Sequence, residues 1–222
     1  MTDSYSMKCL YLPHGLYIFL PTLLATIGWL ATLTEDGCNY AILEGPMVTE
    51  ITTNPNMPFL QVGINSYREA SYNDETWTLD YSQLCQNYNE DIVNIDSVWI
   101  FAKTMSFLSL VFAGAAVLLI WFSSCFTFSR NTWKLIGCEL LTATIFKLLS
   151  YSWFATSMCI NDGQNNCSMS YGTKADIVAC SLWFIAGILV LLRYPPPKSA
   201  NPPPSTTATS PESPALEMPD MT

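Results

Sequence analysis

The chain has 222 residues, of which 50% are hydrophobic and 12% are charged, and its formal net charge is −9. This acidic balance excludes a protein that binds nucleic acid through a basic surface, because such binding requires Lys and Arg to neutralise phosphates. A chain of this length has too little sequence left over to bury several long apolar runs in a soluble core. The composition and these runs together indicate a membrane protein.

Four apolar segments are each long enough to cross a bilayer, whose hydrocarbon core of about 30 Å requires about twenty residues of helix. The first is longer than the apolar region of a signal peptide, and no small-x-small cleavage site follows it, so we expect it to remain as a helix. The sequence therefore predicts an all-α transmembrane protein, a four-helix bundle. Its membrane-spanning helices are expected at residues 15–33, 98–122, 133–158 and 175–193.

Tryptophan pairs flank two of the predicted spans. Trp99 and Trp121 bracket the second span at about 33 Å of helix, and Trp133 and Trp153 bracket the third at about 30 Å. Because Trp is enriched at both membrane–water interfaces, these pairs predict interfacial residues at the ends of the spans.

The distribution of basic residues predicts the orientation of the chain. The connection at 123–132 contains Arg130 and is followed by Lys134, whereas the long connection at 34–97 has one basic residue, Arg68, among many acids. Because cytosolic loops carry the excess of Lys and Arg, we expect both termini in the cytosol and the long loop outside. The cytosolic segments would be 1–14, 123–132 and 194–222, and the outer loops 34–97 and 159–174. The expected location is the plasma membrane or another membrane of the secretory pathway.

Four of the eight cysteines fall in the predicted outer loops, namely Cys38, Cys85, Cys159 and Cys167. An even number of cysteines in an oxidising compartment indicates disulfide bonds. Of the three possible pairings we favour Cys38–Cys85 with Cys159–Cys167, because each bond closes its own loop; a cross-loop pairing is the alternative. No CxxC motif or histidine cluster accompanies them, so no metal site is expected.

Three residues are candidates for covalent modification. Asn166 begins the only N-x-S/T sequon with a permitted middle residue, on the predicted outer side, although a disulfide at Cys167 would compete with glycan transfer. Cys9 and Cys125 lie near the predicted cytosolic ends of spans, where palmitoylation occurs. Reduced thiols are the alternative for both.

Part of the long outer loop has the alternating pattern of β-strands. Residues 77–81 alternate apolar and polar side chains, residues 60–64 do so less regularly, and a turn is expected within 71–75. The pattern predicts a small extracellular antiparallel β-sheet, formed by the first loop and resting on the outer ends of the helices.

Charged residues within the predicted spans are functional candidates, because a charge in the bilayer is costly. Lys147 lies near the middle of the third span without an obvious acidic partner, and is expected either to bind Ser, Thr or carbonyl oxygens or to serve in transport. Lys103 and Asp176 lie near the outer ends of their helices, where they could pair. Glu139 could meet Arg193.

Residues 194–222 are rich in Pro, Ser and Thr and are expected to be disordered, since they cannot bury a core. Residues 211–214 match a PxxP pattern, which proline-recognition domains bind. The tail is therefore either a binding site for such a cytosolic domain or a passive spacer.

The layout of four spans, cytosolic termini, a large first outer loop with strand pattern and a short second loop resembles the claudin and peripheral-myelin-type superfamily. Trp77 and Cys85 correspond to part of the claudin first-loop signature, although its Gly-Leu-Trp does not occur. The resemblance implies a sheet above a four-helix bundle. It also implies a function in cell adhesion, paracellular sealing or membrane organisation.

The sequence offers little support for an enzyme. The only histidine is His14, and the CxxC of vitamin K-type quinone reductases is absent, so no catalytic activity and no cofactor are expected. Two hypotheses remain: adhesion or membrane organisation through the outer loops, or a channel, transporter or auxiliary subunit that uses Lys147 and Glu139. The expected partners are the lipid bilayer and either further copies of the chain or another membrane protein.

Overall fold

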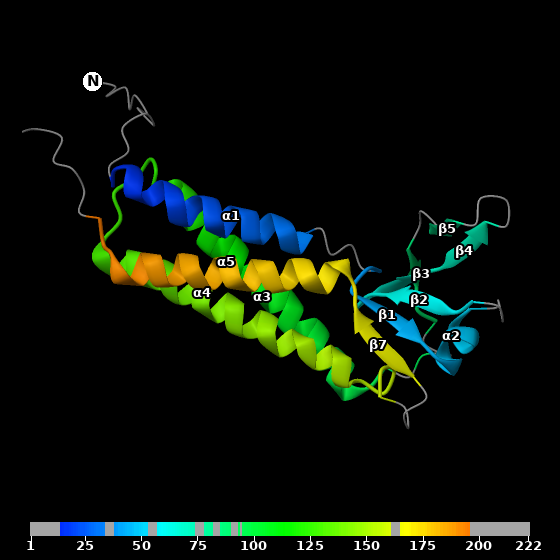
Figure 1. Ribbon diagram of the computed structural model, residues 1–222. Helices are drawn as coiled ribbons and strands as arrows, with labels where there is room; N and C mark the ends of the chain where they lie inside the picture. The colour runs from blue at the N-terminus through cyan, green and yellow to red at the C-terminus, as the bar shows by residue number, and fades with distance from the viewer. Residues whose placement is uncertain are drawn as a thin grey trace, which may run out of the picture.

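The computed structural model describes residues 14–33, 38–52, 57–73, 78–81, 85–89, 93, 95–160 and 165–195. The molecule is elongated, with long helices lying side by side and a β-sheet at one end of them (Figure 1). We call this end of the bundle the sheet end and the other the opposite end. The predictions made for Cys9, Trp77 and residues 196–222 lie outside the described residues.

Among the described residues, four helices are long and apolar enough to cross a membrane, which confirms the predicted all-α transmembrane bundle. Helix α1 packs chiefly on α5, α5 on α4, and α4 on α3, so the chain is a four-span membrane protein whose helices form one bundle. The bounds are α1 Phe19–Leu33 after a 3-10 turn η1 at Leu16–Ile18, α3 Ser97–Phe122, α4 Arg130–Ser150 continued by η2 Tyr151–Ala155, and α5 Tyr171–Leu192.

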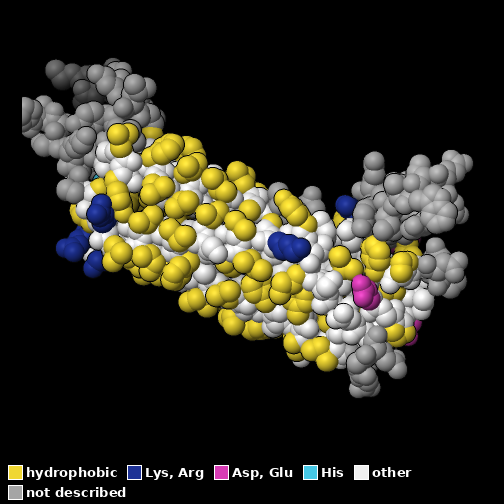
Figure 2. Space-filling view, viewed as in Figure 1, with side chains coloured by type: hydrophobic (Ala, Val, Ile, Leu, Met, Phe, Trp, Pro, Cys, Tyr) yellow, Lys and Arg dark blue, Asp and Glu magenta, His cyan; other side chains and the backbone are white. Residues whose placement is uncertain are grey.

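The surface of the bundle is what a bilayer requires. Large apolar side chains on all four helices point outward, and Phe107 on α3 is 65% exposed. Figure 2 shows hydrophobic side chains covering the helices; one group of Lys and Arg lies at the opposite end, and others lie toward the sheet end. In water such a surface would be an aggregation hazard, whereas in lipid it costs nothing.

Small residues bring the helices of the bundle close together. A Cβ atom added at Gly28 of α1 would lie 2.7 Å from the indole nitrogen of Trp183 on α5. A Cβ added at Gly137 of α4 would lie 2.6 Å from Leu191 and 3.2 Å from the carbonyl oxygen of Gly187, both on α5. The crossings of α5 with its neighbours therefore depend on the absence of side chains at these glycines.

The sheet at the end of the bundle has five antiparallel strands in the order β6-β3-β2-β1-β7. Two further strands, β4 and β5, form a separate antiparallel pair, and a short helix α2 follows β1. We call all of these elements together the head. Their bounds are β1 Ala41–Glu44, α2 Pro46–Ile51, β2 Phe59–Val62, β3 Ser66–Arg68, β4 Ala70–Asn73, β5 Thr78–Tyr81, β6 Gln86–Asn87 and β7 Asn166–Met169.

The head differs from the sequence prediction in three respects. The strand expected at 60–64 is β2 and the one at 77–81 is β5, but they belong to different sheets. Residues 71–73, expected to turn, are part of β4. The edge strand β7 comes from the second loop and pairs with β1, so the five-stranded sheet is not built from the first loop alone.

The head has its own hydrophobic core, and two tryptophans from the helices complete it. Leu43 and Leu60 face each other across β1 and β2 and are buried, and Trp99 of α3 and Trp153 of η2 pack in the same cluster with ring centroids 5.7 Å apart. Trp133 is also buried, in the bundle. The prediction of four interfacial tryptophans is thus wrong for these three, because they fill protein cores; Trp121 is exposed.

Candidate functional site at the junction of sheet and bundle

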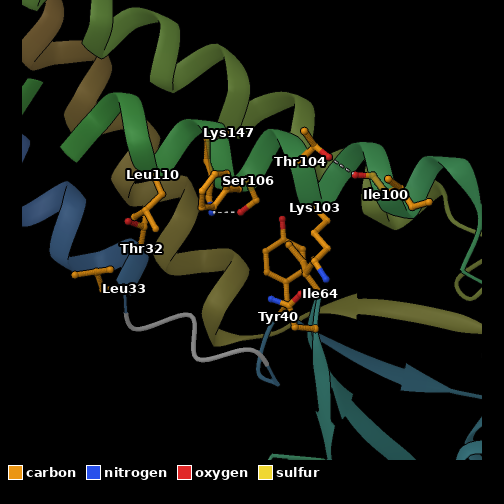
Figure 3. A pocket seen from close by; sticks show the side chains of 12 residues that line it. Thr32, Leu33, Tyr40, Ile64, Ile100, Lys103, Thr104, Ser106, Leu110 and Lys147 are labelled. Carbon is orange, nitrogen blue, oxygen red and sulfur yellow. Dashed lines mark hydrogen bonds between the residues drawn. The ribbon is translucent and has the colours of Figure 1, made fainter. Parts of the chain in front are cut away.

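Lys147 and Asp176 form a buried ion pair near the sheet end of the bundle. The Nζ atom of Lys147 lies 2.7 Å from Oδ2 of Asp176, and the two side chains are 2% and 0% exposed. Lys147 also donates a hydrogen bond to Oγ of Ser106, at 3.3 Å (Figure 3). The pair thus joins α3, α4 and α5. The expectation that Lys147 lacks an acidic partner is wrong.

The partner was missed because the sequence does not show how deep each helix sits. Lys147 is in the last turn of α4 and Asp176 is in the second turn of α5. The two helices run in opposite directions, so these positions lie at the same level. The opposite charges compensate each other inside the bundle, which accounts for the burial of a lysine there.

The other two pairings expected from the sequence do not occur. Lys103 is exposed on α3 and forms no ion pair with the described residues, while Asp176 is bound to Lys147. Glu139 has a buried carboxylate oxygen without a hydrogen-bond partner, rather than a contact with Arg193. The guanidinium of Arg193 instead lies over the ring of Tyr17, 5.7 Å from its centroid.

A pocket of about 530 Å³ opens beside the ion pair, between α1, α3 and the head (Figure 3). A second pocket, of about 940 Å³, adjoins it on the head side, and the two share Ile64, Asn65, Ile100 and Lys103. Lys103 therefore stands at the boundary between them. The first pocket is lined by Thr32, Leu33, Tyr40, Ile64, Asn65, Ile100, Lys103, Thr104, Ser106, Phe107, Leu110 and Lys147.

Asp96 fixes the helices to the head at this junction. Its carboxylate accepts hydrogen bonds from the backbone N–H of Trp99, at 2.7 Å, and of Ser157, at 2.9 Å. The first bond caps the N-terminus of α3, and the second ties α3 to the segment that follows α4. Burial alone would raise the pKa of Asp96, but these N–H donors outweigh it and hold the pKa below its usual value.

The start of α5 is fixed to the head through backbone atoms. The N–H of Gly172 donates to the carbonyl oxygen of Asn39 at 2.9 Å, and the hydroxyl of Thr173 donates to the carbonyl oxygen of Tyr40. A Cβ at Gly172 would lie 2.6 Å from the Asn39 oxygen, so only glycine permits this approach. Nothing in the local sequence signals a contact between residues so far apart in the chain.

Two disulfides brace the head, with the pairing favoured from the sequence. Cys38 is bonded to Cys85 and Cys159 to Cys167. The first bond links the start of the β1 segment to the β6 segment, and the second links the end of the α4 segment to β7. Asn166, the sequon residue, is exposed on β7 beside Cys167, so its glycosylation remains a prediction.

At the opposite end, His14 holds three segments together. Its Nε2 accepts a hydrogen bond from the N–H of Phe128 at 3.1 Å, so Nδ1 carries the proton and donates to the carbonyl oxygen of Pro195 at 2.7 Å. The ring also stacks on Trp133, with centroids 5.7 Å apart. Cys125, nearby in the α3–α4 connection, is disulfide-bonded, so its thiol is not free for palmitoylation in this state.

No group of His, Cys, Asp and Glu suited to a metal ion occurs among the described residues. No protein-family model and no curated protein sequence matches this chain. The fold and the junction therefore define the class directly: an integral, multi-pass, four-span membrane protein with a disulfide-braced head.

Proposed function

We propose that this protein is a non-enzymatic recognition protein, which acts in adhesion, in junction-like contacts or in membrane organisation through its head. The observation that carries the proposal is the rigid attachment of the head to the bundle. Trp99 and Trp153 fill its core, Asp96 caps α3 against it, and two disulfides brace it. A surface held in this way is preorganised, which lowers the cost of binding a partner.

The proposed orientation places the head outside the cell and both termini in the cytosol. Arg130, Lys134 and Arg193 lie at the opposite end of the helices, and under the positive-inside rule they favour a cytosolic location for it. Lys103 and Lys174 lie in the first two turns of α3 and α5, at the sheet end. Disulfide-bonded cysteines lie at both ends, so the cysteines do not distinguish the two sides. The orientation therefore rests on the basic residues. It is tested by the access of membrane-impermeant reagents to tags at each terminus in intact cells.

The edge strand β7 is the part of the head best suited to meet a partner. Among the described strands it pairs with β1 alone, and its Ser168 and Met169 are exposed. An open edge presents unpaired N–H and C=O groups on which another chain can add a strand. We propose either a second copy of this chain or another membrane protein as the partner, as in the claudin-type proteins that the layout resembles.

The test is the distribution of a fluorescently tagged chain in pairs of touching cells. Enrichment at contacts only when both cells express it supports homotypic recognition by the head. A uniform distribution, or one confined to internal membranes, would contradict the adhesion proposal. Met169→Lys should abolish enrichment because a charge protects an exposed strand edge from pairing. Thr49→Lys is the matched control, since it puts the same charge on exposed α2.

A channel, transporter or auxiliary transport subunit is the second candidate, and the pocket that reaches Lys147 is the observation in its favour. The ion pair weighs against it, because the charge of Lys147 already has a partner in the bundle. The test is flux through the double variant Lys147→Met/Asp176→Leu, which removes both charges together. Loss of flux at an unchanged surface level would favour transport over recognition.

A further inference from the structure

Lys103 lies at the boundary of two pockets and has no ion-pair partner among the described residues. It is exposed on the first turns of α3 and lines both cavities. Figure 3 shows it in the first of them. The chain has twice as many acidic as basic residues, 18 against 9, yet none of the described residues that line the two pockets is an acid. Lys147, which also lines the first pocket, forms an ion pair with Asp176. Among the described lining residues, the uncompensated charge that a ligand would meet is therefore the positive charge of Lys103.

On the bundle side of Lys103, the first pocket is largely apolar and lies between two membrane-spanning helices. Phe107 and Leu110 follow Lys103 at helical spacing on one face of α3, over about 10 Å of helix, and Leu33 of α1 lines the same pocket. Further into the bundle the seam closes, because Trp29 of α1 packs against Gly114 of α3. A Cβ atom added at Gly114 would lie 3.1 Å from the indole nitrogen of Trp29. The result is a blind apolar seam that begins at the head and ends within the bundle.

On the head side of Lys103, the lining of the second pocket becomes polar. The second pocket reaches Asn65 on the β2–β3 connection, Asn87 on β6 and Asn89 beyond it. Amide groups both donate and accept hydrogen bonds. From the bundle toward the head, the described lining of the two pockets thus changes from apolar side chains to a cation and then to amide groups. A membrane lipid has a matching order of chemical groups, from the acyl chain to the charged and polar atoms of the headgroup.

We propose that the seam between α1 and α3 binds an anionic membrane lipid. One acyl chain lies along Phe107 and Leu110, the phosphate or carboxylate of the headgroup binds Lys103, and the remaining polar atoms reach Asn65 and Asn87. The volume of about 530 Å³ is in the range of small-molecule sites. The described lining residues offer a positively charged headgroup no acid to compensate it, whereas they offer an anionic one Lys103. This proposal is independent of whether the head binds another chain.

The test uses the full chain in nanodiscs of neutral phosphatidylcholine, with trace phosphatidic acid that carries a photoactivatable group on one acyl chain. Peptide mapping should place the crosslinks on α1 and α3 around Leu33, Phe107 and Leu110. Lys103→Met should lower this labelling about tenfold, the effect of losing a charge-assisted hydrogen bond. Lys103→Arg should restore it. The matched control is Lys174→Met, which removes an exposed lysine of α5 that lines neither pocket.

Two further measurements separate the lipid from its parts. A phosphatidylcholine probe with the same photoactivatable chain should label the seam about tenfold less than phosphatidic acid. Inorganic phosphate should not compete, since the acyl chain contributes most of the binding area. Equal labelling by both lipids, or labelling unchanged in Lys103→Met, would overturn the proposal. Competition by inorganic phosphate at millimolar concentration would also overturn it, in favour of an anion site without a lipid.

Discussion

The head and the bundle are held together by different means. The head relies on two disulfides and on large aromatic side chains, with Trp99 and Trp153 at the centre of its core. The bundle relies on close approach, where glycines such as Gly28 and Gly137 let neighbouring helices pack closely, and on one buried ion pair. Each solution suits its surroundings: water drives aromatic burial in the head, whereas lipid gives the helices no hydrophobic reason to associate.

The comparison also shows where the two regions depend on each other. The tryptophans of the head core are carried by α3 and η2, and the first turn of α5 bonds to the backbone of Asn39 and Tyr40. The junction is therefore part of both regions. Substitutions on either side of it distinguish regional effects from shared ones.

The largest effect should come from separating the ion pair in the bundle. Lys147→Met leaves the Asp176 carboxylate buried without its counter-charge, and we expect it to lower the free energy of unfolding by about 3–5 kcal/mol. The double variant Lys147→Met/Asp176→Leu should recover most of this loss. Thermal unfolding in detergent micelles, followed by tryptophan fluorescence, measures both. Equal losses in the single and double variants would show that the pair does not stabilise the bundle through charge compensation.

Removing the disulfides of the head should come next. In the loop-closure treatment, a bond across a sequence separation of 47 contributes about 4 kcal/mol and one across 8 about 2.5 kcal/mol. Cys38→Ser/Cys85→Ser should therefore destabilise the head more than Cys159→Ser/Cys167→Ser. Limited proteolysis of the head measures this order while the helices remain protected. If either double variant makes the bundle as sensitive to the protease as the head, the disulfides do not stabilise the head separately from the bundle.

Filling a close helix crossing should have an intermediate effect confined to the bundle. Gly137→Val places a side chain against Leu191 and the Gly187 backbone, and such overpacking typically costs about 1–3 kcal/mol. Leu135→Val, on the exposed face of the same helix, is the matched control and should be nearly neutral. Thermal unfolding in micelles again gives the difference. A large loss in the control would assign the effect to α4 as a whole.

The smallest effect should come from the cap at the junction, where it depends on pH. The lowered pKa of Asp96 means that its carboxylate stabilises the folded state at neutral pH, and that this contribution is lost as pH falls below the ordinary value of 3.8. Asp96→Ala should cost about 1 kcal/mol at pH 7. The gap between wild type and variant should narrow on acidification. Thermal unfolding at pH 7 and in acid tests this, and a gap that widens in acid would contradict it.

The bundle was readable from the sequence because twenty-residue apolar runs have few alternatives in so short a chain. The bonded cysteines of the head were readable as well, since each bond closes a local loop. The partner of Lys147 was not readable, because it depends on the relative depth of α4 and α5, which hydropathy does not record. The burial of Trp99 and Trp153 was also missed, because a helix extended into a head looks the same in sequence as one that ends at a membrane surface.

The pairing of β1 with β7 ties the order of synthesis to the final topology. β1 follows the first helix, whereas β7 emerges only after α3 and α4 have been made. The five-stranded sheet can close only if both strands reach the same side of the membrane, which requires an even number of crossings between them. If only one of α3 and α4 fails to insert, β1 and β7 are separated by the bilayer. The five-stranded sheet therefore forms only when α3 and α4 have either both inserted or both failed to insert.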